Sequence, residues 1–207
     1  MLKYNEYITE RIGVKKIVKK IDKNELIEAS KRGSANKVKE LLKKGEYDIN
    51  EQDKEGKTAL MWATLNRFIS VVDVLIDAKA DTNIKDNFSR TALMMATTMK
   101  VIDKLLEGSA DINIQSNLGQ TAIIQYLSYN QSIYFTVLEK FLKLGLNLDL
   151  KDNNGDNLYD HVKKSIKVLG GLERVNFFKD VEKYLDENFP QYKEEWELKQ
   201  NMEKYNL

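Results

Sequence analysis

GKTALMWA occupies residues 56–63, and related stretches follow it along the chain. SRTALMMA begins at Ser89, GQTAIIQY begins at Gly119, and a more distant version, GDNLYDHV, begins at Gly155. The starting positions are therefore 33, 30 and 36 residues apart. A period near 33 residues with one motif per period indicates a stack of repeated supersecondary units.

One such unit, from Asp53 to Lys85, predicts two helices joined by short connections. DKEGKT predicts a turn in which Gly56 adopts a positive φ. Thr58 then fits a helix N-cap, as Thr91 does in the next unit. ALMWATLN predicts a short helix, and SVVDVLIDAKA, with apolar residues at helical spacing, predicts a longer one. Neither helix buries its apolar stripe alone, so neighbouring units must stack.

Several positions recur together in these units. They are Gly56, Thr58, Ala59, Leu60 and Ala63; Thr91, Ala92, Leu93 and Ala96; Ala80, Asp81 and Asn83; and Ala110, Asp111 and Asn113. On these residues the sequence resembles the ankyrin repeat family over residues 24–162. The resemblance implies an all-α fold, an ankyrin-type α-solenoid of about five helix-turn-helix repeats with helical caps at both ends.

The sequence also departs from the family pattern. Ala follows each motif threonine where the family has Pro, Met or Ile replaces the usual His, and Ser89 replaces a turn glycine. The third unit is three residues short and the fourth is three residues long. We expect both length changes at the break between the two helices of a unit, where changes in length are best tolerated.

We expect repeats at 24–162, with units near 24–52, 53–85, 86–115, 116–151 and 152–169. Residues 1–23 form an N-terminal capping helix in this interpretation, and residues 170–207 form C-terminal capping helices. The N-terminal segment has an apolar side and a basic side with Lys15, Lys16, Lys19 and Lys20. Its alternative role is attachment to an anionic membrane or RNA. We favour the cap, because solenoids need polar-faced ends.

The composition argues against catalysis. The chain of 207 residues has no cysteine and one histidine, His161, so it has neither a standard zinc set nor a Cys–His pair. DNNGD at 152–156 resembles a calcium loop only superficially, since its glycine is misplaced and the bidentate Glu is missing. We expect no enzyme activity, no metal and no cofactor.

Charge and hydropathy bear on the partner and the compartment. A net charge of +1 argues against a dedicated nucleic-acid binder, and no apolar run is long enough for a transmembrane helix. We therefore expect neither nucleic acid nor membrane to be bound. The N-terminal segment shows no secretory signal, so we expect a cytoplasmic protein, which we take to be a monomer. The resemblance implies that its partner is another protein. The alternative is an effector or enzyme with its activity in residues 163–207, although no polar constellation there supports it.

The resemblance implies that the turn tips and the ends of the first helices bind the partner. Phe88 and Leu118 occupy the same position in adjacent turns, and an apolar residue at an exposed tip suggests a binding hot spot. The alternative is that each folds onto the neighbouring turn. The full set of expected partner-binding residues is Lys54, Glu55, Lys57, Leu65, Asn66, Asn87, Phe88, Arg90, Thr98, Asn117, Leu118, Gln120, Asn153 and Asn154.

Overall fold

A computed structural model describes residues 24–129, 131–168 and 172–205. Every regular element in these ranges is an α-helix, and no strand occurs among them. The predicted all-α solenoid is therefore confirmed. The expected capping helix at 1–23 lies outside the described residues. None of the described helices combines the length and the apolar character needed to cross a membrane.

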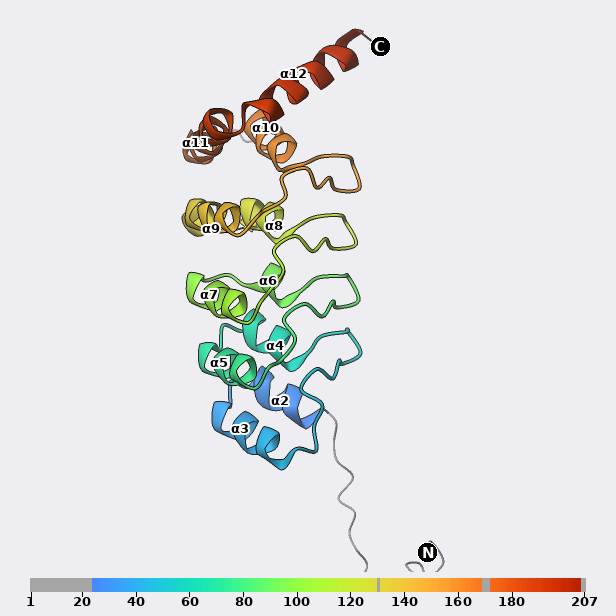
Figure 1. The fold of residues 1–207 in the computed structure, drawn as a ribbon, viewed down its shortest axis with the longest axis vertical. Helices are drawn as coiled ribbons and strands as arrows, with labels where there is room; N and C mark the ends of the chain where they lie inside the picture. Colours follow the sequence, from blue (N-terminus) through green and yellow to red (C-terminus); the bar gives the residue numbers. More distant parts are fainter. Residues whose placement is uncertain (1–23, 130, 169–171, 206–207) are drawn as a thin grey trace, which may run out of the picture.

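The helices stack in pairs in chain order, so that the first helices form one column and the second helices form another (Figure 1). Loops project from the stack on one side, and each leads into the first helix of the next pair (Figure 1). The pairs are α2 (Glu25–Lys31) with α3 (Ala35–Lys44), α4 (Ala59–Leu65) with α5 (Ile69–Asp77), α6 (Ala92–Met95) with α7 (Met99–Glu107), α8 (Ala122–Tyr129) with α9 (Gln131–Lys143), and α10 (Leu158–Val168) with α11 (Leu172–Asn188).

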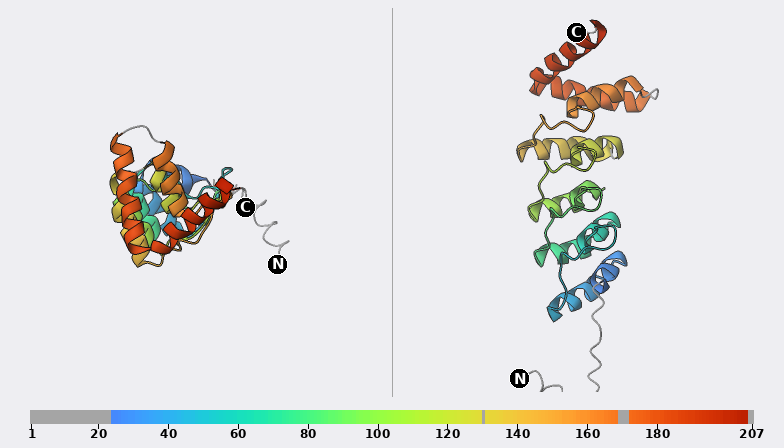
Figure 2. Two further views of the ribbon diagram at one scale, coloured as in Figure 1. Left: turned by 90° about the horizontal axis from the view of Figure 1, so that it is seen from above. Right: turned by 90° about the vertical axis from the view of Figure 1, so that its right-hand side faces the viewer.

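A last helix, α12 (Pro190–Tyr205), crosses the end of the stack toward the loop side (Figure 2). It packs against α10 and α11. The Tyr192 hydroxyl donates to Asp149 Oδ1 at 2.7 Å, and Lys151 pairs with Glu195 at 3.1 Å. Pro190 begins the helix, where its missing N–H leaves no hydrogen bond unmade. Polar contacts thus tie α12 to the loop that precedes the last pair.

The core follows the spacing seen in the sequence. Each second helix buries its apolar stripe completely, and Val71, Val72 and Leu75 of α5 are inaccessible to solvent. The corresponding residues of α7 and α9 are equally buried: Val101, Ile102, Leu105, Val137, Leu138 and Phe141. Small alanines begin α4, α6 and α8, and their burial lets adjacent first helices approach closely. Each helix therefore buries its apolar side only through its neighbours.

The length changes fall at the helix ends that border the break between the two helices of a unit, so the expected location is right, but the helices change in length. Residues 66–68 connect α4 to α5 and residues 96–98 connect α6 to α7, so both connections have the same length. The third unit instead has a first helix of four residues, against seven in α4. The fourth unit lengthens its second helix to 13 residues, against nine in α5. In both units the change is taken up where a helix meets the break: α6 ends a turn early, and α9 is extended.

Candidate partner-binding surface

Four hairpin loops project from the stack, at residues 53–57, 86–90, 116–120 and 152–156. Three of them begin with an aspartate whose carboxylate accepts two backbone N–H groups of the same loop. Asp86 Oδ1 accepts from Phe88 at 2.9 Å and from Arg90 at 2.8 Å, and Asp53 and Asp152 have the same arrangement. The third loop has Ser116, whose hydroxyl accepts only from Leu118, at 3.3 Å. In each loop the side chain of the first residue thus accepts hydrogen bonds from the loop's own backbone, and these bonds hold the tip in one conformation.

Asparagines at the tips connect each loop to the one before it. The side chain of Asn87 donates to the carbonyl of Lys54 at 2.9 Å, that of Asn117 donates to Asn87 at 3.2 Å, and that of Asn153 donates to Asn117 at 2.8 Å. Their backbone N–H groups also donate to the preceding loop. Sequence analysis missed this role, although asparagine recurs at this position in three loops. These residues hold the loops in line, and their part in binding stays a prediction.

Phe88 and Leu118 point outward, as expected for tip residues. Their exposed fractions are 60% and 64%, so they do not fold onto the neighbouring turns. The Arg90 guanidinium lies 4.9 Å from the centre of the Phe88 ring, and Asp86 Oδ2 accepts from its Nε and Nη2 at 3.0 and 2.7 Å. The hairpin thus holds a cation against one face of an exposed aromatic ring.

Lys57 lies inside the surface and does not project from it. Only 8% of the residue is exposed, its ammonium pairs with Glu55, and it lies 4.4 Å from the centre of the Trp62 ring. The Trp62 indole donates to Asp53 Oδ2 at 2.7 Å. Burial alone would raise the pKa of Asp53, but the hydrogen bonds from the indole and from backbone N–H groups lower it below its usual value. The partner-binding role expected for Lys57 therefore does not fit its burial.

The other expected residues differ in accessibility. Leu65 is 43% exposed at the end of α4, and the neighbouring Asn66 is exposed while its amide donates weakly to Lys31 at 3.5 Å. Thr98 is less suitable, because its hydroxyl oxygen is buried without a hydrogen-bond partner. The remaining expected residues are exposed or half-exposed: Lys54, Glu55, Gln120 and Asn154.

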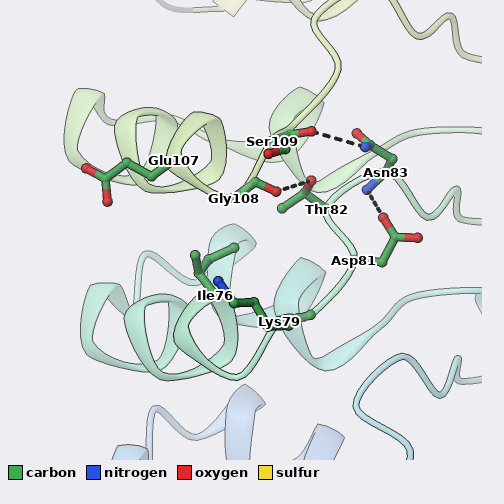
Figure 3. Close-up of a pocket in the computed structure, with 9 residues that line it drawn as sticks. Ile76, Lys79, Asp81, Thr82, Asn83, Glu107, Gly108 and Ser109 are labelled. Atoms are coloured by element: carbon green, nitrogen blue, oxygen red, sulfur yellow. Dashed lines mark hydrogen bonds between the residues drawn. The ribbon is translucent and has the colours of Figure 1, made fainter.

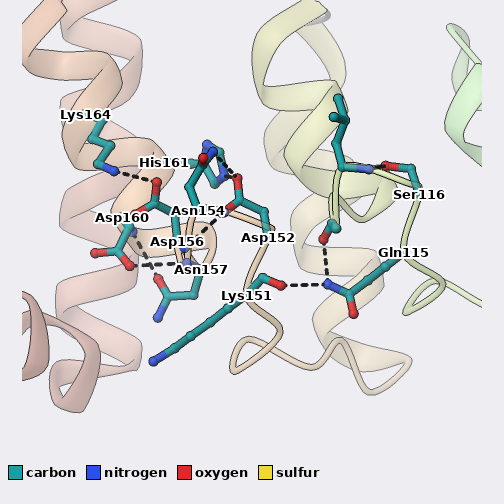
Figure 4. Close-up of polar contacts among 12 residues, drawn as sticks. Gln115, Ser116, Lys151, Asp152, Asn154, Asp156, Asn157, Asp160, His161 and Lys164 are labelled. Atoms are coloured by element: carbon teal, nitrogen blue, oxygen red, sulfur yellow. Dashed lines mark hydrogen bonds and ion pairs between the residues drawn. The ribbon is translucent and has the colours of Figure 1, made fainter.

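The fourth hairpin loop contains a compact cluster of polar side chains (Figure 4). Asp152, Asp156 and His161 bring ligand-type atoms within 4.8 Å of one another, and His161 Nε2 lies 3.1 Å from Asp152 Oδ2. Asp156 also pairs with Lys164 at 2.5 Å and with Lys199 of α12 at 3.5 Å. The lysines balance the carboxylates, so the cluster is explained as a contact between the last loop, α10 and α12. The sequence pattern gave no sign of this contact.

The pKa of Asp152 is lower than usual for an aspartate. Burial works against the charged form, but backbone N–H groups of Asp156 and Asn154 donate to the carboxylate, and the neighbouring His161 adds a smaller electrostatic contribution in the same direction. The net effect favours the carboxylate. The same loop design that shapes the tip therefore also keeps this buried group charged.

A cavity of about 320 Å³ lies between the second and third units, at the ends of α5 and α7 (Figure 3). Gly108 makes room for it, since a Cβ there would come within 2.9 Å of Ile76 and Thr82. The wall includes Lys79, Asp81 and Glu107 and none of the expected partner-binding residues. It has no convergent set of side chains that favours one ligand, and the hairpin side remains the better candidate.

Comparisons with known proteins agree with the repeat pattern. Residues 26–116 match the family model described as ankyrin repeats (3 copies). The chain is 45% identical over 64 residues to proteins named mitochondrial disaggregase of Bos taurus and Homo sapiens, a match that covers 31% of this chain and 9% of those proteins. It is 44% identical over 59 residues to the putative ankyrin repeat protein YahD of Escherichia coli, over 28% of this chain and 29% of that protein. Each of these matches to a named protein covers less than a third of this chain.

Proposed function

Because this chain is an ankyrin-repeat protein, we propose that it is a non-catalytic module that binds another protein through its hairpin tips and first-helix ends. The working unit in this proposal is a single copy in the cytoplasm, and nucleic acid and membranes are not its ligands. The chain spans only 9% of the mitochondrial disaggregases it resembles, so their name carries no activity over to it.

One observation supports the proposal most directly. Phe88 and Leu118 are large, apolar and more than half exposed, yet each is fixed on a loop that is tied to its neighbours by side-chain and backbone hydrogen bonds. Exposing such side chains is unfavourable in water unless something covers them. A rigid support also lowers the entropy lost on binding. Both properties are expected of hot-spot residues.

The test compares binding with folding in the double variant Phe88→Ala/Leu118→Ala. The partner is first recovered by affinity pull-down from the native source and identified by mass spectrometry. Exposed tips contact few core atoms, so we expect each change to cost less than ~1 kcal/mol of unfolding free energy, against ~2–5 kcal/mol for the buried Leu75→Ala. Binding should fall by ~2 kcal/mol or more.

Two results would contradict the proposal. If the double variant unfolds as readily as Leu75→Ala, the tips contribute to the core and not to recognition. If it folds and binds like the parent protein, the tips are not the anchors, and substitutions at Leu65 and Asn66 then test the first-helix ends.

A further inference from the structure

One long segment of the chain carries no charge. Residues 112–138 contain no Asp, Glu, Lys, Arg or His, although 31% of the whole chain is charged. The segment covers the third hairpin loop, all of α8 and the beginning of α9. Two first helices before it, α4 and α6, are also uncharged, whereas α2 carries Glu25, Glu28 and Lys31. The uncharged part of the first-helix column is therefore limited to α4, α6 and α8, which are mostly buried, and it reaches a hairpin tip only at the third loop.

The stacking geometry does not require this absence of charge. The second loop pairs Asp86 with Arg90, four residues apart, and the third loop has Ser116 and Gln120 at the same positions. The backbone closes both loops in the same way: Ser116 N donates to Gln120 O at 3.0 Å, and Asp86 N donates to Arg90 O at 2.9 Å. Yet Ser116 makes one long hydrogen bond where Asp86 makes two short ones. The backbone of the third loop could therefore donate to a carboxylate at position 116, but the sequence has a serine there.

The surface that results has the composition of an interface centre. The middle of a protein interface is depleted of charge and enriched in apolar side chains, with a polar rim around it. Leu118, 64% exposed, stands on the uncharged loop, and Phe88 stands on the loop beside it. Exposed Lys54 and Glu55 lie on the first loop, and charged residues return in the fourth loop and α12. Charged residues in the first loop and in the fourth loop with α12 therefore lie on either side of the uncharged third loop.

We propose that the third hairpin loop, 116–120, is the centre of the binding surface and that it takes an apolar, uncharged segment of the partner protein. This inference rests on the proposed function and specifies its ligand. A charged partner side chain placed against residues 116–120 would lose its water without meeting an opposite charge, which is costly. Apolar side chains meet Leu118 and Phe88 without that cost.

The experiment uses a phage-displayed library of random linear 12-residue peptides as the probe, selected against the full chain. We expect the enriched peptides to be rich in apolar residues and poor in charge. Their affinity should change less than about twofold between low and high salt, because screening acts on charges. Leu118→Ser should weaken binding roughly 30-fold, a typical hot-spot loss. Leu144→Ser/Leu198→Ser, which changes leucines 56% and 62% exposed outside the hairpins, is the matched control and should bind like the parent.

A second variant separates binding from folding. Ser116→Asp/Gln120→Arg rebuilds the ion pair of the second loop in the third. The unfolding midpoint should equal or exceed that of the parent, whereas affinity for the selected peptides should fall at least about tenfold. Unchanged affinity in this variant would overturn the assignment of residues 116–120 as a neutral centre.

Other results would also overturn it. These are enrichment of charged peptides whose binding falls steeply with salt, no enrichment over an unrelated protein, or equal losses in Leu118→Ser and the control pair. A concentration-dependent dimer in sedimentation velocity that Leu118→Ser abolishes would assign the surface to a second copy of this chain. In each case the proposed function still stands if the pulled-down partner loses affinity for Phe88→Ala/Leu118→Ala, so the two failures are distinguishable.

Discussion

Two threonines at the same position of the repeat have different surroundings. Thr58 Oγ1 accepts from the backbone N–H of Met61 at 3.2 Å and caps α4, as expected from the sequence. Thr91 precedes α6 with the same extended backbone, but its hydroxyl oxygen is buried and makes no hydrogen bond, so the expected cap is absent. The corresponding backbone N–H, that of Met94, donates to the Thr91 carbonyl oxygen instead, at 3.2 Å. A motif therefore locates a helix start, but the hydrogen bond there depends on the helix that follows.

The first prediction compares Thr58→Val with Thr91→Val. Removing the Thr58 hydroxyl leaves a backbone N–H without its acceptor and should cost ~1 kcal/mol of unfolding free energy. Removing the Thr91 hydroxyl deletes a buried polar group that has no partner, so the change should be neutral within ~0.5 kcal/mol or stabilising. Urea unfolding of both variants measures the difference. Equal losses would show that Thr91 caps α6 in solution.

The second prediction concerns acid pH. The pKa values of Asp53 and Asp152 are lowered in the folded protein, by hydrogen bonds that outweigh burial. Their contribution to stability is therefore complete above the unfolded pKa of about 3.9 and is lost as the pH falls through the folded pKa. Asp53→Asn/Asp152→Asn should be less stable than the parent at pH 7 by ~1–3 kcal/mol, and should lose less stability between pH 5 and pH 3. Parallel pH profiles of the two proteins would contradict this assignment.

At the scale of the element, the ends of the second helices share one backbone conformation. In the first four units the first or second residue after each of these helices has a positive φ: 65° at Gly45, 66° at Lys79, 66° at Ser109 and 86° at Gly145. In the second unit, Lys79 N donates to Ile76 O and Ala80 N donates to Leu75 O, both at 2.9 Å, which satisfies carbonyls at the helix end. Two of the four ends therefore hold side chains in a conformation that favours glycine.

The third prediction is that Lys79→Gly and Ser109→Gly each stabilise the protein by ~0.5 kcal/mol. Relief of the left-handed conformation outweighs the extra freedom that glycine gives the unfolded chain. Gly145→Ala is the matched control, in which a side chain is added at a positive φ. The new Cβ would have no neighbour within 4 Å, so the only loss expected is that of holding alanine in the left-handed conformation. This variant should lose ~1 kcal/mol. Urea midpoints that move the other way would mean that these helix ends adopt another conformation in solution.

At the scale of the molecule, the repeat period predicted the stack and its buried stripes, because both follow from local spacing. The sequence did not reveal which polar side chains the folded structure covers or engages in hydrogen bonds. Lys57 looks like an exposed tip residue, but Trp62 of the following helix covers it. The tip asparagines look available, but each bonds the loop before it. The exposure of Phe88 and Leu118 was one of two open alternatives, and only the stacked structure distinguished them. The asparagine bonds join residues 30 to 36 apart in the sequence, and the Lys57 contact depends on how the loop folds against its own helix, so the repeat motif predicts neither.

The last prediction concerns where the stack opens. In a solenoid each unit is held only by its neighbours, so stability varies along the chain and a weak internal unit limits the cooperativity of the whole. The third unit is weak: α6 has four residues, and the hydroxyls of Thr91 and Thr98 are buried without partners. Its N–H groups at Met94 and Ala96 reach carbonyls only three residues back, at 3.2 Å, whereas α4 has bonds four residues back at 3.1 Å.

Backbone amides of Met94–Ala96 should therefore exchange hydrogen at least tenfold faster than those of Trp62–Asn66, although α6 lies in the middle of the stack and its residues are buried. Mass spectrometry or NMR on the full chain measures both sets in one sample, so α4 serves as the internal control. Two-state unfolding with equal protection in both helices would show that burial by α4 and α8 compensates for the short helix. Faster exchange at α6 alone would instead locate the opening between the loops that carry Phe88 and Leu118. The spacing of the two anchors would then depend on the least stable helix of the stack.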